Sequence, residues 1–230
     1  MKILALETSA KAVSAAVVEN GKVLCSGYQD TGLTHSRTLM PIVEGILKNT
    51  DMTMADCDVI AVSAGPGSFT GIRIGVAAAK GLAFGADKPA VGVSTLAAMA
   101  RNVAHVDGLI ICAMDARRQQ IYNAVFEAKD GQLTRLSEDR AISLADLAEE
   151  LKTCDLSKIV VGDGAHLCYN YLSEQGISCR LAPPQLVMQN AMSVALEAEA
   201  MAANGETVSA QELQPVYLRP AQAQKLKDRI

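Results

Sequence analysis

The amino-acid sequence predicts a two-lobed α/β fold, with a mixed sheet and flanking helices in each lobe. Short apolar runs alternate with amphipathic segments along the chain, which is typical of layered α/β proteins. A strand-turn-strand segment near the N-terminus occurs again in the second half of the chain. The 230 residues are enough for two lobes that each bury a core. Together these observations indicate an internal duplication.

The first lobe is expected to open with an antiparallel meander. Residues 3–6 and 13–18 are short apolar runs, and residues 19–22 form a hairpin turn that leads into a third strand. Residues 36–48 then carry apolar side chains at helical spacing. This pattern predicts an amphipathic helix that Ser36 caps.

Two further strand-helix pairs are predicted after that helix. Residues 58–63 form a buried strand that runs into a tight turn at 65–68, and a helix begins near Thr70. Residues 89–93 form the next strand and residues 95–104 the next helix.

The second half of the chain repeats this start. Residues 3–7 align with 111–115, and residues 13–19 align with 121–127 without a gap. A helix at 143–152, a strand at 158–161 and a glycine-rich turn at 162–164 follow. The alternative, that two unrelated hairpins share a common β-branched alternation, stays open from the sequence alone.

In each copy the first strand ends on a carboxylate, Glu7 or Asp115. This is the plan of the actin, sugar kinase and Hsp70 (ASKHA) superfamily, whose lobes are ribonuclease H-like. In that plan the two carboxylates face each other across an interlobe cleft. We expect an N-terminal lobe at 1–104, a C-terminal lobe at 105–188, and at 189–230 a helix that returns to the first lobe, followed by a mobile tail.

The predicted cleft lacks features of a nucleotide site. Phosphates approach the backbone closely and need Gly or small residues after each carboxylate. Asp115 is followed by 116–119 without any Gly, where Arg117 and Arg118 could contact an anion or could form a solvated charged turn. We predict weak or absent ATP binding and no bound cofactor, with Glu7 and Asp115 as vestigial cleft carboxylates.

Metal and nucleophile chemistry are also disfavoured. The three histidines, His35, His105 and His166, are far apart and form no ligand pair at metal-binding spacing. Ser68 lies in a strand-to-helix turn, but the G-x-S-x-G spacing of a nucleophile elbow is missing. Helix capping by Ser68 or Thr70 explains the same turn. We predict no metal site and no catalytic residue.

The helix at 72–84 has more apolar surface than one sheet face requires. Its only charged residues are Arg73 and Lys80, and both remaining faces are apolar or small. The second face either packs on helices of the same lobe or binds another protein. We predict a partner interface on this helix and the 36–48 helix that contains Leu39, Val43, Ile46, Ile72, Val76, Ala79 and Ala83.

Composition limits the function classes. The net charge of −4 and the pI of about 5.4 argue against a protein that holds nucleic acid by itself. The six cysteines are scattered without a C-x-x-C pair, which favours reduced thiols in a cytoplasmic protein. No apolar stretch has the length of a membrane-spanning helix, so we expect no membrane association.

Seven segments resemble the TsaB (YeaZ) family. They are ILALETS, THSRTLMPIVEGIL, SAGPGSFTGIRIGVAAAKGLAFG, PAVGVSTLAAMA, MDARRQQIYNAVF, VVGDGA and PVYLRP. The resemblance runs from Met1 to about Pro220. The SAGPGSFTGIRIG block is specific, whereas ILALETS is shared with the catalytic paralogue TsaD.

This resemblance implies a non-catalytic scaffold in the synthesis of N6-threonylcarbamoyladenosine in tRNA. In the family, TsaD transfers the threonylcarbamoyl group, TsaB binds TsaD through N-terminal helices, and the ATPase TsaE joins them. TsaB also forms homodimers, and tRNA is bound only through the complex. TsaD carries a metal-binding H-x-x-x-H where this chain has Thr95 to Met99, so both ligand positions lack imidazole. The competing interpretation is an ATP-dependent phosphotransferase or hydrolase of the actin-like superfamily, which Glu7 and Asp115 favour.

Overall fold

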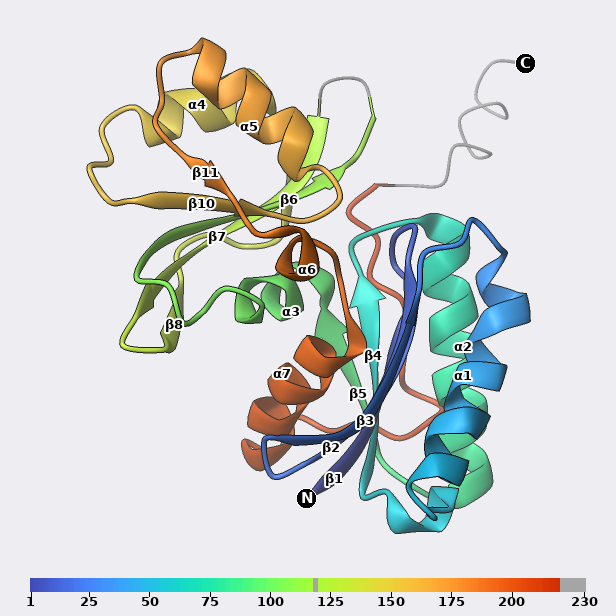
Figure 1. Cartoon of the computed structure of the whole chain (residues 1–230). Helices are drawn as coiled ribbons and strands as arrows, with labels where there is room; N and C mark the ends of the chain where they lie inside the picture. Colours follow the sequence, from blue (N-terminus) through green and yellow to red (C-terminus); the bar gives the residue numbers. More distant parts are fainter. Residues whose placement is uncertain (118–119, 220–230) are drawn as a thin grey trace, which may run out of the picture.

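The computed structural model describes residues 1–117 and 120–219 and shows two lobes, each built on one sheet (Figure 1). The first sheet contains β1 (Lys2–Glu7), β2 (Val13–Glu19), β3 (Lys22–Gln29), β4 (Val59–Gly65) and β5 (Ala90–Ser94). The second contains β6 (Gly108–Asp115), β7 (Gln120–Lys129), β8 (Gln132–Arg135), β10 (Lys158–Val161) and β11 (Arg180–Leu181), and β9 (Arg140–Ser143) pairs with β7. Arg118 and residues 220–230, which include the predicted tail, lie outside the described residues.

The two sheets share one topology, which confirms the predicted duplicated plan. The strand order is β3-β2-β1-β4-β5 in the first sheet and β8-β7-β6-β10-β11 in the second. In both, the first two pairings are antiparallel and the last two are parallel. The lobes therefore arise from the same succession of hairpin, strand and crossover helices.

The gap-free alignment of the two copies is wrong by one residue in the second strand. Glu7 pairs with Ser14, so the alignment places Tyr122 opposite Asp115. In the structure Ile121 pairs with Asp115, and Tyr122 pairs with Met114. The connection between β6 and β7 is thus one residue shorter than that between β1 and β2, which the side-chain pattern alone did not reveal.

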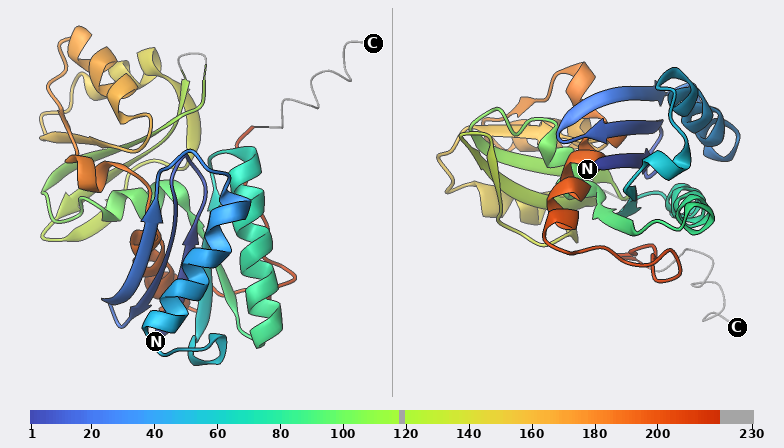
Figure 2. Two further views of the ribbon diagram at one scale, coloured as in Figure 1. Left: turned by 45° about the vertical axis from the view of Figure 1, so that its right-hand side comes forward. Right: turned by 90° about the horizontal axis from the view of Figure 1, so that it is seen from below.

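Helices cover both faces of each sheet. In the first lobe α1 (His35–Asn49) and α2 (Phe69–Ala86) lie side by side on one face, and α7 (Ala191–Ala203) packs on the other (Figure 2). In the second lobe α4 (Leu144–Leu151) and α5 (Ala165–Glu174) cover one face. α3 (Thr95–Arg101) packs under the opposite face between the lobes, and the short α6 (Pro184–Val187) adjoins it, while η1 (Met54–Asp56) precedes β4.

The predicted helix boundaries hold in part. Ser68 caps α2 as expected, because its Oγ accepts the Gly71 backbone N–H at 3.3 Å. The predicted Ser36 cap is wrong, because α1 begins at His35 and Thr34 occupies the cap position without a side-chain bond. α3 ends at Arg101, three residues earlier than predicted. No helix in the ranges 1–117 and 120–219 is both long and apolar enough to cross a membrane.

The seven side chains predicted as a partner interface lie in the core of the first lobe. None is more than 4% exposed, and all of them pack between the sheet and the two helices. The prediction of their outward orientation was wrong, because the bulkiest apolar stripe of each helix faces the sheet. These residues are Leu39, Val43, Ile46, Ile72, Val76, Ala79 and Ala83.

Candidate functional site: the cleft between the lobes

A cleft of about 390 Å³ opens where the two lobes meet. The turn after β1 and the turn between β4 and α2 form one side, and the turn after β6 forms the other. A segment near the C-terminus, residues 215–219, closes the rim, and we call it the strap. The lining residues include Ser9, Lys11, Gly67, Ser68, Phe69, Asp115, Arg117, Tyr122, Asp163, Tyr217 and Arg219.

The two carboxylates predicted to face each other have different environments. Glu7 is 1% exposed and does not line the cleft. Its carboxylate accepts the Ser9 backbone N–H at 2.5 Å and the Ser63 hydroxyl, so it ties the end of β1 to β4. Burial raises the pKa of Glu7, and the hydrogen bonds oppose that shift only in part. Asp115 is exposed and lines the cleft.

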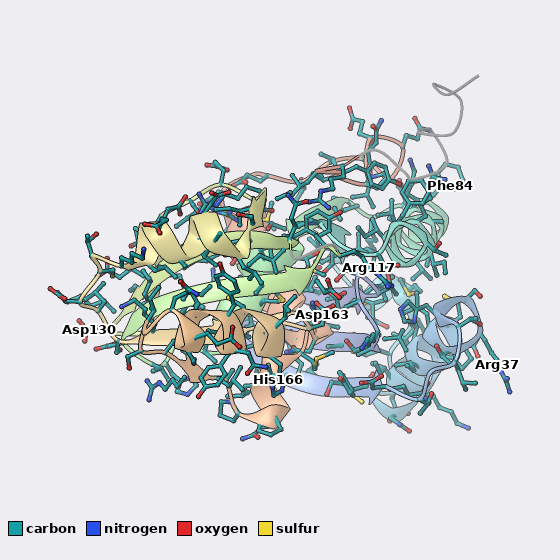
Figure 3. The ribbon with its side chains drawn as sticks, turned by 90° about the horizontal axis from the view of Figure 1, so that it is seen from above. Arg37, Phe84, Arg117, Asp130, Asp163 and His166 are labelled. Carbon is teal, nitrogen blue, oxygen red and sulfur yellow. The ribbon has the colours of Figure 1, made fainter. Side chains whose placement is uncertain are left out.

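Asp115 stabilises its own turn. One carboxylate oxygen accepts the Arg117 backbone N–H at 2.7 Å. Arg117 has a φ of +66°, a left-handed conformation that costs a non-glycine residue roughly 1 kcal/mol. The turn is closed by the Gln120 N–H, which donates to the Arg117 carbonyl at 3.2 Å. The carboxylate thus holds a strained turn that presents Arg117 between the lobes, where Figure 3 labels it near Asp163.

The first hairpin turn is fixed against the start of α2. The Ser68 N–H donates to the Ser9 carbonyl at 2.7 Å. A side chain at Gly67 would overlap the Ser9 carbonyl, and one at Gly71 would overlap the Thr8 carbonyl. These glycines are needed for the close approach of the two backbones. The N–H groups of Ser9 and Ser68 already donate to Glu7 and to the Ser9 carbonyl, so neither is free to bind a phosphate.

The strap joins the lobes at the rim of the cleft. The Val216 N–H donates to the Ala64 carbonyl at 2.7 Å, and Arg73 Nε donates to the Tyr217 hydroxyl at 2.9 Å. On the other lobe, Arg219 donates to the Ala116 carbonyl at 3.0 Å and to the Gln120 side chain. Sequence reasoning missed this element, and its only signal was the PVYLRP segment.

Asp163 was also missed, because its glycine-rich turn gave no chemical signal. It is largely buried in the cleft wall, and Gln189 Nε2 donates to it at 2.8 Å. Burial raises the pKa of Asp163, and the nearby Asp115 charge adds to this effect while Lys11 opposes it. The cleft therefore has cations from both lobes and one carboxylate that resists ionisation.

Other polar ties hold the lobes in place. The Ser94 hydroxyl donates to Asp139 at 2.6 Å, and Arg135 pairs with the same carboxylate at 2.7 Å. Asn102, which is nearly buried, donates to the carbonyls of Leu186 and Met188. Polar contacts between the lobes thus occur at the strap and at both ends of α3, where Ser94 and Asn102 are the cap residues.

Comparison with known proteins identifies relatives. The family model "TsaD: tRNA N6-adenosine threonylcarbamoyltransferase" matches residues 29–215. The chain is 38% identical to the tRNA threonylcarbamoyladenosine biosynthesis protein TsaB of Bacillus subtilis over 167 residues, 73% of each chain. It is 31% identical to the Escherichia coli TsaB over 222 residues, 95% of each chain.

Solved structures agree with the two-lobed fold. YeaZ from Pseudomonas aeruginosa superimposes with a TM-score of 0.80 at 27% identity, covering 94% of this chain and 99% of that chain. The ROK hexokinase from Thermus thermophilus superimposes with a TM-score of 0.50 at 14% identity, covering 89% of this chain and all of that chain. The latter similarity concerns the fold alone and confirms the predicted actin-like class.

Proposed function

Since the chain belongs to the TsaB family, we propose that it is a non-catalytic subunit of a complex that makes N6-threonylcarbamoyladenosine in tRNA. Its partners in this proposal are a TsaD-type transferase and the ATPase TsaE. In the absence of the transferase, a second copy of the chain occupies the same surface. The tRNA is then held by the assembled complex.

The outward face of α2 carries this proposal. Arg73, Ala77, Gly81 and Phe84 follow one another at helical spacing, and all four are exposed, Phe84 to 71%. Apart from the neighbouring residues and backbone of α2 itself, no atom of the described residues lies within 4 Å of the position that a Gly81 Cβ would take. Small residues allow the backbone of a second helix to approach closely, and an exposed aromatic ring provides an anchor. Figure 3 shows Phe84 on the outer side of the first lobe.

Partly exposed apolar side chains of α1 and α2 extend this surface. Met40 and Leu47 of α1 and Ile74 and Leu82 of α2 are half-buried and pack against the rim of the core. They remain partly accessible, unlike the seven side chains beneath them. The proposed interface therefore lies on the same two helices as predicted from the sequence, but on their outer faces.

Three features favour a non-catalytic role. Thr95 and Met99, at the positions that carry the metal-binding histidines in TsaD, are fully buried at 0% and 1% exposure. Among the described residues, no group of three or more His, Cys, Asp or Glu side chains is placed to hold a metal ion. Glu7 is buried and does not line the cleft. These observations also disfavour the alternative ATP-dependent phosphotransferase or hydrolase.

The test is the Gly81→Glu variant, with Gly81→Ala as the matched control. Both replacements should stabilise the isolated chain by roughly 0.5 to 1 kcal/mol, because Gly is a poor helix former and the new side chain has open space. Gly81→Glu should weaken association with the transferase at least tenfold, because it places a charge in a close helix contact. Gly81→Ala should have a much smaller effect. Thermal unfolding and analytical ultracentrifugation measure the two quantities.

The same variants are then used in a reconstituted reaction with TsaD, TsaE, tRNA and threonylcarbamoyl adenylate. Transfer should require this chain and fail with Gly81→Glu. Transfer that persists when TsaD is omitted would overturn the non-catalytic role. Unchanged association of Gly81→Glu would instead exclude the α2 surface.

A further inference from the structure

We propose that the rim of the cleft binds unpaired nucleotides of the RNA substrate, by stacking a base on Tyr217 and contacting phosphates through Lys11 and Arg117. This inference rests on the proposed function in tRNA modification and adds a direct RNA contact to it. The contact lies on the strap and on the turns of both lobes. It adjoins the α2 face assigned to the transferase at Arg73, eight residues before Gly81.

Tyr217, the proposed stacking surface for the base, is held in place by Phe69 and Arg73. The rings of Phe69 and Tyr217 are 5.0 Å apart at 33°, and the Arg73 guanidinium lies 3.9 Å above the Phe69 ring. Arg73 also donates to the Tyr217 hydroxyl, so the ring orientation is set before any ligand arrives. Tyr217 is nevertheless 38% exposed. Aromatic rings and guanidinium planes are the surfaces on which unpaired bases stack.

Cations from both lobes surround this platform. Lys11 and Arg117 are exposed on the turns after β1 and β6, and neither forms an ion pair with another described residue. Arg219 donates to uncharged groups, so its charge is also uncompensated. The cleft lining contains three cationic side chains and two carboxylates, those of Asp115 and Asp163. The charge of the cleft lining is therefore positive even with both carboxylates ionised, although the whole chain has a net charge of −4.

These features favour a single strand over a duplex or a free nucleotide. A duplex hides the faces of its bases, and the net charge of −4 provides no general attraction to its phosphates. A free nucleoside triphosphate needs unoccupied backbone N–H groups at the hairpin turns. In the first turn, the Ser9 and Ser68 N–H groups already donate within the protein. A volume of about 390 Å³ admits one nucleotide-sized ligand while the neighbouring strand remains in solvent.

Fluorescence anisotropy at low salt tests this site with a labelled single-stranded RNA octamer, a duplex of the same length, and ATP as competitor. We expect the octamer to bind and the duplex to bind at least tenfold more weakly. Tyr217→Ala should weaken octamer binding roughly 5- to 150-fold, because one stacked base contributes about 1 to 3 kcal/mol. Tyr217→Phe, which keeps the ring, should stay within about threefold of the wild type.

The contribution of the two cations is tested by the salt dependence of octamer binding. Lys11→Ala or Arg117→Ala should reduce the slope of binding against salt by about 0.7, the value for one phosphate contact on a single strand. Lys129→Ala, at the exposed end of β7, should leave affinity and slope unchanged.

Three results would overturn the site: no octamer binding by the wild type at millimolar protein, unchanged binding by Tyr217→Ala, or ATP binding more tightly than the octamer. Gly81→Glu separates this inference from the proposed function. It should retain octamer binding while losing the transferase, and Tyr217→Ala should do the reverse.

Discussion

Ala79→Asp is expected to unfold the first lobe, with a loss of more than about 4 kcal/mol in the free energy of unfolding. Ala79 is 0% exposed and lies between α2 and the sheet, in a cluster made only of apolar side chains. A carboxylate at this position would lose its hydration without gaining a cation or a hydrogen-bond donor in return. Because small proteins are stable by only about 5 to 15 kcal/mol, the variant should be largely unfolded or insoluble.

The matched control is Ala77→Asp, two residues earlier on the same helix. Ala77 is exposed, so the same replacement costs only the difference in helix propensity, below about 1 kcal/mol. Urea unfolding followed by circular dichroism measures both variants. Equal midpoints for the two would mean that Ala79 faces solvent, and would restore the interface that the sequence pattern alone predicted.

This pair of positions illustrates which features the sequence could establish. The 3.6-residue period shows that α2 has two apolar faces, but it does not show which of them meets the sheet. That choice depends on volume, because Ile72 and Val76 fill the space above β1 and β4 while Ala77 and Gly81 do not. The elements and the duplicated topology follow from local pattern and are confirmed by the structure.

The cleft was less predictable for a different reason. Its strap has no helical or strand period, and its contacts join residues about 100 or more positions apart, such as Arg73 with Tyr217 and Arg219 with Gln120. Asp163 likewise becomes notable only when the fold places it beside Asp115 and Lys11. By contrast, Asp115 ends a strand in a turn, and sequence analysis placed it in the cleft.

Glu7→Gln and Glu7→Ala should differ sharply in stability. In Glu7→Ala, the Ser9 N–H and the Ser63 hydroxyl lose their buried acceptor, which costs roughly 1 to 3 kcal/mol for each unsatisfied group. In Glu7→Gln the amide oxygen still accepts one of these bonds, and no charge is buried. Urea unfolding at pH 7 should therefore place Glu7→Ala well below the wild type, and Glu7→Gln close to it or above it.

The pH dependence separates a structural carboxylate from a functional one. The pKa of Glu7 is raised by burial in the folded chain, so the folded state holds this proton over a range where the unfolded state has lost it. The contribution of Glu7 to stability is therefore fully present at a pH below its ordinary pKa of 4.5. It is lost as the pH rises through the higher pKa of the folded state. Glu7→Gln removes this loss, so its stability relative to the wild type should increase with pH from 4.5 upward.

Glu44→Gln, at an exposed position on α1, is the control. A difference that is flat with pH would contradict a buried, proton-holding Glu7. If Glu7→Gln also retains transfer in the reconstituted reaction, the carboxylate that ends β1 serves the fold of this lobe and not the chemistry of the complex.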